Sequence, residues 1–244
     1  MEKAYQVIIL VGGVGKRTYP LTKEIPKALV PVNGKPILEI KINYLKKWGF
    51  KNIILCVGYK GNLIERYFKD GKDFGVNIQY SYEEELLGTG GAIKNAEHLI
   101  RGDFIAMNGD DYILLDFDRL LDFHHMHNAE ITMVVSKASN PREQEIIELD
   151  NYKIVRIYKR GTVEHADFLE QCFSPLINGG TYVINKDLLK EIPIRRKISL
   201  EHEIFPILIG RMHGFLYEGY QKDITSIGDS EKIREEIRKH SLPI

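Results

Sequence analysis

Short apolar runs alternate with amphipathic segments through the first half of the chain. Residues 7–11, 52–58 and 104–107 are almost continuously apolar, which is typical of strands covered on both faces of a sheet. Residues 36–48 and 62–69 instead place their apolar side chains three or four positions apart, which predicts helices. Repeated strand–helix units predict an α/β fold with a mostly parallel sheet and helices on both faces.

The remaining pattern is less regular but contains no repeat, low-complexity tract or linker, which favours a single domain over residues 1–244. Further strands are expected at 76–82, 131–135, 145–149, 153–158, 181–184 and 215–219. Further helices are expected at 92–100, 117–126, 199–210 (bent by Pro206) and 230–240.

Composition narrows the functional classes. The 34 Lys and Arg residues balance the 34 Asp and Glu residues, so overall charge gives no reason to expect a nucleic-acid or membrane partner. No apolar run approaches the roughly 18 residues of a membrane helix. The first strand starts too early to leave room for a signal peptide. Cys56 and Cys172 lack metal-binding spacing, so we expect two reduced thiols in a cytoplasmic protein.

A glycine-rich turn, GGVGKR at 12–17, follows the first strand directly. Glycines allow backbone N–H groups to approach an anion closely. The turn lacks the spacing of a P-loop and the third glycine of a dinucleotide-binding turn. Prolines at 20, 26, 31 and 36 exclude an immediate helix and stiffen a loop that carries several cations. These features together predict a polyphosphate site rather than a solvated basic loop.

These residues resemble a known signature. The segments GGVGKRTYPLT at 12–22, PK at 26–27 and VNGKP at 32–36 are similar to G-G-x-G-T-R-L-x-P-L-T…P-K…G-K-P of sugar-1-phosphate nucleotidyltransferases. Lys16 stands where threonine is usual, and Thr18 where leucine is usual. The resemblance implies a three-layer Rossmann-like fold with a mostly parallel mixed sheet and a small antiparallel addition. It also implies transfer of a nucleoside monophosphate from an NTP to a sugar 1-phosphate, with release of pyrophosphate.

The resemblance also implies roles in a nucleotide-binding half, residues 1–112. Arg17 would grip the β- and γ-phosphates, and Lys27 would lie near the phosphates at the reaction centre; both are the expected catalytic residues. The segment EELLGTGGA at 84–92 resembles the family's base-reading segment, in which backbone groups near Gly88 contact the nucleobase. The expected nucleotide-binding residues are Leu10, Gly12, Gly13, Gly15, Lys16, Glu85, Gly88, Thr89 and Asp110.

Carboxylates follow the apolar strand at 104–107. A side chain at the carboxyl end of a parallel strand faces the ligand crevice, and a carboxylate there suits Mg²⁺. The family's N-G-D motif maps its metal ligand to Asp110, with Asp111 as a local rival. A second metal aspartate maps to Asp223, although an apparent insertion after it keeps Asp229 as an alternative.

The acceptor half, residues 113–244, contains the most instructive departure from the family. Asn178, Gly179 and Glu201 match segments that line the sugar pocket. The usual F-x-E-K segment reads IYKR at 157–160, so its sugar-binding glutamate is missing, while Lys159 or Arg160 remains to bind phosphate. The acceptor could therefore be an unusual sugar or another phosphorylated compound.

The LGTGGA segment at 87–92 looks most like that of guanylyltransferases that act on mannose or heptose 1-phosphate. Thymidylyl, uridylyl and cytidylyl transfer are alternatives, as is a catalytically silent nucleotide-sugar sensor. A homo-oligomer is also compatible with the sequence. The histidines at 124, 125 and 127 lack a further ligand at helical spacing, so an exposed helix surface is favoured over a zinc site.

Overall fold

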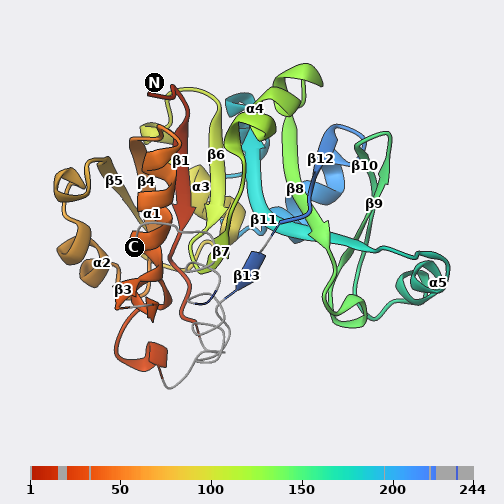
Figure 1. Cartoon of the computed structure of the whole chain (residues 1–244), viewed down its shortest axis with the longest axis horizontal. Helices are drawn as coiled ribbons and strands as arrows, with labels where there is room; N and C mark the ends of the chain where they lie inside the picture. The colour runs from red at the N-terminus through yellow and green to blue at the C-terminus, as the bar shows by residue number, and fades with distance from the viewer. Residues whose placement is uncertain are drawn as a thin grey trace.

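The computed structural model describes residues 2–15, 21–32, 34–194, 196–219, 221–223 and 235. Within them, a central sheet of nine strands has the order β5-β4-β1-β6-β11-β8-β12-β10-β9 (Figure 1). Its strands are β1 Gln6–Leu10, β4 Asn52–Val57, β5 Asn77–Tyr82, β6 Phe104–Asn108, β8 Ile131–Lys137, β9 Ile146–Asp150, β10 Lys153–Tyr158, β11 Leu176–Ile184 and β12 Met212–Tyr217. Two small antiparallel sheets pair β2 Pro31–Val32 with β3 Lys35–Pro36, and β7 Asp111–Ile113 with β13 Gln221–Asp223.

The central sheet changes character half-way across. β1 pairs in parallel with β4 and β6, and β4 pairs in parallel with β5. β11 then runs antiparallel to both β6 and β8, while β8 and β12 are again parallel. The expected α/β fold with a mixed sheet and a small antiparallel addition is confirmed, and its uninterrupted parallel part is the β5-β4-β1-β6 half.

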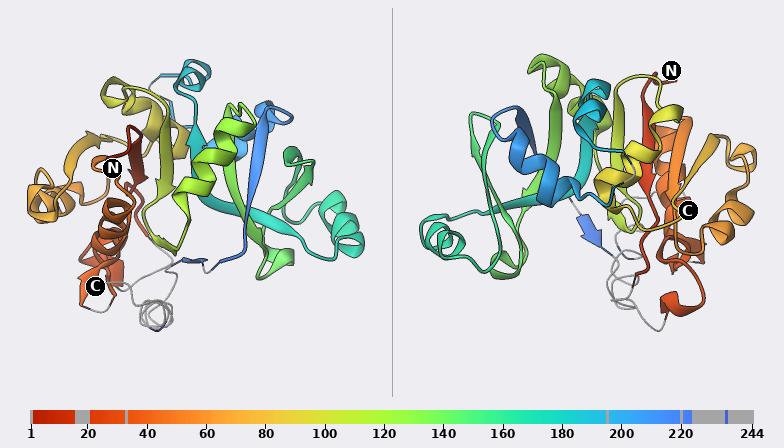
Figure 2. Two further views of the ribbon diagram at one scale, coloured as in Figure 1. Left: turned by 45° about the horizontal axis from the view of Figure 1, so that its top comes forward. Right: turned by 180° about the vertical axis from the view of Figure 1, so that it is seen from behind.

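Helices cover both faces of this sheet because successive strand residues point in opposite directions. Val7 and Ile9 pack with α1 Ile37–Lys47, α2 Gly61–Phe68 and α4 Phe117–Met126. Ile8 packs on the other face with α3 Gly88–Asn95 and the short helices η7 Lys186–Glu191, η8 Leu200–Ile204 and η9 Phe205–Leu208. The views from the front and from behind show these separate layers (Figures 1 and 2).

The remaining helical segments are short, apart from one that the sequence pattern did not predict. They are η2 Leu21–Lys23, η3 Lys27–Leu29, η4 Lys72–Phe74, η5 Glu97–Leu99 and η6 Pro141–Glu143. The unpredicted helix is α5 Val163–Gln171, capped by the side chain of Thr162, which accepts a hydrogen bond from the backbone N–H of His165. It lies beside β9 and β10 at the far end of the molecule (Figure 1).

Two expected helices differ from the structure. The helix expected at 92–100 begins earlier, at Gly88, and ends at Asn95 before a separate 3₁₀ turn. The bent helix expected at 199–210 is a π turn, η8, followed by the 3₁₀ turn η9, because Pro206 cannot donate the backbone hydrogen bond of a continuing α-helix. The helix expected at 230–240 lies outside the described residues apart from Glu235. Across the described ranges, no helix is both long and apolar enough to cross a membrane.

Candidate active site

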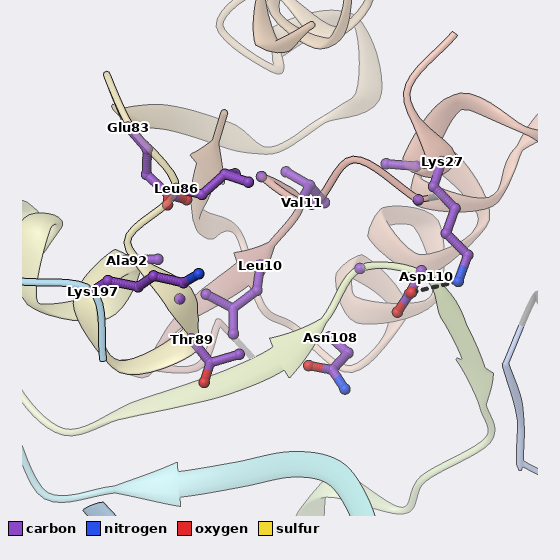
Figure 3. Close-up of a pocket in the computed structure, with 16 residues that line it drawn as sticks. Leu10, Val11, Lys27, Glu83, Leu86, Thr89, Ala92, Asn108, Asp110 and Lys197 are labelled. Atoms are coloured by element: carbon purple, nitrogen blue, oxygen red, sulfur yellow. Dashed lines mark hydrogen bonds and ion pairs between the residues drawn. The ribbon is translucent and has the colours of Figure 1, made fainter. Parts of the chain in front are cut away.

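A cavity of about 490 Å³ opens beyond the carboxyl ends of β1 and β6 (Figure 3). It collects residues from five separate segments of the sequence. The expected site residues that line it are Leu10, Gly12, Gly13, Gly15, Lys27, Gly88, Thr89 and Asp110. Lys16 and Arg17 lie outside the described residues. Glu85 does not line the cavity, and Glu83 does.

The glycine turn is fixed where it leaves β1. The backbone carbonyl of Gly12 accepts a hydrogen bond of 3.1 Å from the backbone N–H of Tyr59. A Cβ at Gly12 would require the carboxylate of Glu83 to move, because it would otherwise lie 2.4 Å from Oε1 of that side chain. Gly15 has a φ of +65°, and its carbonyl accepts a 2.8 Å hydrogen bond from the Thr22 hydroxyl. The glycines therefore hold the backbone against the cavity at both ends of the turn.

An ion pair joins the two charged residues expected at the reaction centre. Nζ of Lys27, from η3, lies 2.6 Å from Oδ2 of Asp110, which follows β6 (Figure 3). The lysine side chain is 11% exposed and the aspartate side chain 41% exposed, so the carboxylate is the more accessible partner. An ammonium group has three donors, so Lys27 keeps two others for ligand oxygens.

Asp111 has a structural role. Its side chain is 1% exposed and lies 2.5 Å from Nζ of Lys41, which also donates 2.7 Å to the carbonyl of Asn108. This buried pair ties α1 to the end of β6. Asp111 is therefore enclosed in the protein, and Asp110 is the aspartate that lines the cavity.

The backbone of Asp223 approaches the same place. β13 pairs antiparallel with β7, and Asp223 lies opposite Asp111, the neighbour of Asp110. The side chains of Asp223 and Asp229 lie outside the described residues. The exposed carboxylate of Asp110 at the cavity suits a divalent ion completed by water and phosphate oxygens, and the backbone of Asp223 lies on the adjoining strand. The described residues contain no group of three or more His, Cys, Asp and Glu placed to hold a metal.

The expected base-reading segment is joined to the loop before η8. The backbone N–H of Ile198 donates to the carbonyl of Leu87 at 2.7 Å, and that of Gly90 donates to the carbonyl of Ile198 at 2.9 Å. Glu83 accepts a 2.8 Å hydrogen bond from the backbone N–H of Leu87. Burial raises the pKa of the Glu83 carboxyl above its usual value.

Two charged lining residues were missed by the sequence interpretation. Glu83 follows β5 just as Asp110 follows β6, so its position at the carboxyl end of a parallel strand was the available signal. Lys197 reaches the cavity from the loop before η8 and lies beside Ala92 in the close-up (Figure 3). No motif marks this lysine, because its place depends on the pairing of Ile198 with α3.

A second cavity of about 570 Å³ gathers the expected acceptor residues from the other half of the sheet. It is lined by Glu143, Glu145, Lys159, Arg160, Glu201 and His202. Arg160 lies 3.6 Å from the Glu143 carboxylate. The structure therefore brings Lys159, Arg160 and Glu201 together. The carboxylates of Glu143 and Glu145, which precede β9, line the same cavity.

Asn178 and Gly179 lie where β11 is irregular. The side chain of Asn178 donates a hydrogen bond of 2.7 Å to the hydroxyl of Tyr182. It also accepts a hydrogen bond of 2.8 Å from the backbone N–H of Gly180. Gly180 has a φ of +66°, and a Cβ there would lie 2.5 Å from Nδ2 of Asn108, which lines the first cavity. The irregular strand thus runs past the end of β6, against the first cavity rather than in the second.

One of the three histidines differs from the expected exposed surface, whereas His125 is exposed. His124 is buried, not exposed, and its Nδ1 lies 2.8 Å from the hydroxyl of Thr132. His127 packs against Phe123 at a ring separation of 4.2 Å. The apolar face of α4 turns His124 inward, so these rings belong to the packing between α4 and the sheet.

Residues 6–229 match the family described as nucleotidyl transferase. The chain belongs to this family. This nucleotidyl transferase is 35% identical over 219 residues to the D-glycero-α-D-manno-heptose 1-phosphate guanylyltransferase of Campylobacter jejuni, covering 89% of this chain and 87% of the relative. It is 30% identical to the enzyme of the same name from Aneurinibacillus thermoaerophilus, covering 96% and 99%. It is 33% identical to the mannose-1-phosphate guanylyltransferase of Mycobacterium tuberculosis, but spans only 61% of that protein.

Solved structures agree with this assignment. HddC from Yersinia pseudotuberculosis complexed with GMP-PN superposes with a TM-score of 0.80 and 28% identity, covering 96% of this chain and 99% of that one. The predicted family, sugar-1-phosphate nucleotidyltransferase, and the predicted enzyme class are confirmed.

Proposed function

We propose that this nucleotidyl transferase transfers GMP from GTP to a mannose- or heptose-type sugar 1-phosphate, giving a GDP-sugar and pyrophosphate. The relatives that match it along most of its length are heptose 1-phosphate guanylyltransferases. The observation that carries the proposal is the first cavity. Its glycine turn, Lys27, Asp110 and base-reading segment could contact the different parts of one nucleoside triphosphate. Thymidylyl, uridylyl and cytidylyl transfer are the alternatives.

The polarity of one end of the cavity supports guanine. Glu83 provides a hydrogen-bond acceptor and Lys197 a donor, and the backbone around Gly88 lies between them in the chain. Guanine carries acceptors at O6 and N7 and a donor at N2, so one base can use both side chains. Guanine presents two adjacent donors, N1–H and the N2 amino group, to a carboxylate, whereas thymine and uracil present N3–H alone and cytosine its amino group alone, so Glu83 supports guanine.

The acceptor needs positioning more than activation. A phosphate monoester has a second pKa of about 6 and is largely ionised at neutral pH, so no general base has to remove its proton. Its oxygen attacks the α-phosphorus in line, the bond to the β-phosphate oxygen breaks, and pyrophosphate takes the electron pair. Repulsion between the two anions is offset by Lys27, by Arg17 of the glycine loop, and by Lys159 or Arg160 from the acceptor side.

We assign a divalent ion, Mg²⁺, to Asp110 and Asp223. When bound there, it would neutralise phosphate charge that the lysines and arginines leave uncompensated. Lys27 keeps Asp110 oriented toward the cavity through their 2.6 Å ion pair. The retained Asp110 and Lys27 also favour an enzyme over a silent sensor of nucleotide-sugars.

The acceptor cavity supports a polyhydroxylated sugar phosphate. Lys159 and Arg160 offer cations for the phosphate, and Asn178 and Gly179 remain expected acceptor residues on β11. Glu143 and Glu145 line the acceptor cavity although the family's own glutamate is missing from IYKR at 157–160. Carboxylates accept hydrogen bonds from sugar hydroxyls, so these two can take over that role.

The division of labour follows the two cavities. Residues 1–112 would mainly bind the nucleotide and residues 113–244 the acceptor. Both cysteines are free, which fits a reducing compartment such as the cytoplasm. Self-association of the chain into a homo-oligomer also stays a proposal.

Pyrophosphate release tests the assignment directly. The protein is incubated with Mg²⁺, each NTP in turn and a panel of sugar 1-phosphates; we expect release with GTP and a mannose- or heptose-type acceptor. Asp110→Ala should lower turnover by at least about 100-fold, because it removes charge compensation at the phosphates. Asp73→Ala is the matched control, since it breaks the surface pair Lys69–Asp73 of 3.0 Å. Turnover with another NTP alone refutes the guanine assignment, and near-normal turnover by Asp110→Ala refutes the role of Asp110.

A further inference from the structure

A side-chain hydrogen bond connects the first cavity, which we call the donor cavity, with the second, which we call the acceptor cavity. Thr89, near the start of α3, lines the first cavity, and Glu201, in η8, lines the second. The hydroxyl of Thr89 donates to Oε2 of Glu201 over 2.6 Å. These residues are 112 positions apart in the sequence, so the contact exists only in the folded chain.

Each hydroxyl group in this contact accepts one hydrogen bond and donates another. The backbone N–H of Leu200 donates to Oγ of Thr89 at 2.8 Å, so the threonine's own proton is free for Glu201. Ser199 receives a hydrogen bond of 3.2 Å from the backbone N–H of His202 and donates to the same Oε2 of Glu201 at 2.6 Å. A hydroxyl has one proton, so both hydroxyls are committed to the carboxylate. Glu201 is therefore held in one orientation by two donors.

The surroundings make this orientation rigid. Tyr182 is almost fully buried, and burial together with the neighbouring Glu201 carboxylate raises its pKa, which keeps the phenol protonated. Asn178 fixes the Tyr182 hydroxyl at 2.7 Å. On the other side, Gly90 and Gly91 both donate to the carbonyl of Ile198, which keeps α3 and the loop before η8 together.

We propose that Glu201 is a positioning residue, which through Thr89 keeps the acceptor cavity in register with the bound nucleotide. In-line transfer requires the acceptor oxygen to face the α-phosphorus, and a misplacement of about 1 Å can cost about 100-fold in rate. The Thr89–Glu201 bond is the direct side-chain contact that fixes this distance. The inference rests on the proposed function because it concerns the alignment of the donor and acceptor of that reaction.

A double-mutant cycle tests the proposal. Thr89→Val removes the hydroxyl at nearly constant shape, and Glu201→Gln removes the charge that accepts both hydroxyl protons. We expect each change to lower kcat by about 10-fold at saturating substrates, and the double variant to be no slower than the slower single variant, because both break one contact. The Kd for the NTP alone, measured by calorimetry, should change by less than about 2-fold, since the contact acts on alignment rather than on nucleotide affinity.

The matched control is Thr132→Val. This change also removes a side-chain hydrogen bond, the one between Thr132 and His124. Thr132 lies near the start of the inner strand β8, whereas the first cavity opens at the carboxyl end of β6. The Tm of this control variant should fall while kcat stays unchanged, which separates a loss of stability from a loss of alignment. The proposal would be overturned if the two reductions in kcat multiplied in the double variant. It would also be overturned if Thr89→Val weakened only nucleotide binding and Glu201→Gln raised only the KM for the acceptor.

The choice of nucleotide does not enter this test. If the wild-type protein uses another NTP and not GTP, the guanine assignment fails, and the same cycle is measured with the accepted nucleotide. If the wild-type protein uses GTP but the two changes act independently, the guanine assignment stands and the positioning role of Glu201 fails.

Discussion

Replacing Gly88 with alanine perturbs the contact between α3 and the loop before η8. Gly88 has a φ of +71°, and a Cβ built there would lie 2.5 Å from the carbonyl oxygen of Ile198. Ordinary contact begins at 3.4 Å, so the two backbones must separate by about 0.9 Å. The carbonyl of Ile198 cannot move freely, because it accepts hydrogen bonds from Gly90 and Gly91 at 2.9 and 3.2 Å.

The cost has two parts. A left-handed backbone costs alanine about 1–2 kcal/mol relative to glycine. Weakening the two hydrogen bonds adds about 0.5–1.5 kcal/mol for each. The free energy of unfolding should therefore fall by about 2–5 kcal/mol, which corresponds to a Tm decrease of roughly 5–15 °C for a chain of this size. Because the backbone of Gly88 itself lines the first cavity, the affinity for the NTP should fall as well.

Gly210→Ala isolates the contribution of the clash. Gly210 has a φ of +85° but nothing within 4 Å of a Cβ, so alanine there costs only the backbone term. Thermal unfolding of both variants and calorimetric titration with GTP measure the difference. If Gly88→Ala lowers Tm no more than Gly210→Ala, the close approach of Ile198 to Gly88 does not limit the fold, and the reasoning is refuted.

Two further predictions concern buried polar groups. Lys41→Met removes the cation that lies 2.5 Å from the buried carboxylate of Asp111 and should cost about 3–5 kcal/mol in urea unfolding. Lys41→Met combined with Asp111→Leu should recover much of that loss, and equal losses in both variants would contradict the pairing. Burial lowers the pKa of His124 to about 4, below its unfolded value near 6.5, so the unfolded chain binds more protons in between. Stability should fall as the pH drops from about 6.5 to 4, by up to about 3 kcal/mol, and His124→Gln should flatten this part of the Tm–pH curve; an unchanged curve would show that His124 does not cause it.

The sequence predicted site residues where a polar residue or a glycine turn comes directly after a strand. The glycine turn after β1 and Asp110 after β6 were predicted because strand ends and turn residues have short-range signals. Glu83 was missed in favour of Glu85, because three consecutive glutamates at 83–85 offer no local means of choosing among them. The end of β5 selects Glu83, whose carboxylate is held by the backbone of Leu87.

The sequence by itself determined the elements whose signals are local, namely the buried strands, the helix α1 and the glycine turn that follows β1. Tertiary structure decided which distant groups meet. The pairing of Ile198 with Leu87 brings Lys197 into the donor cavity, and the bond from Thr89 to Glu201 joins the two cavities. It also decided that His124 is buried and that Asp111 is neutralised by Lys41. Periodicity reports on neighbours within a few residues, whereas these contacts depend on strand order and helix placement, which only the packed core fixes.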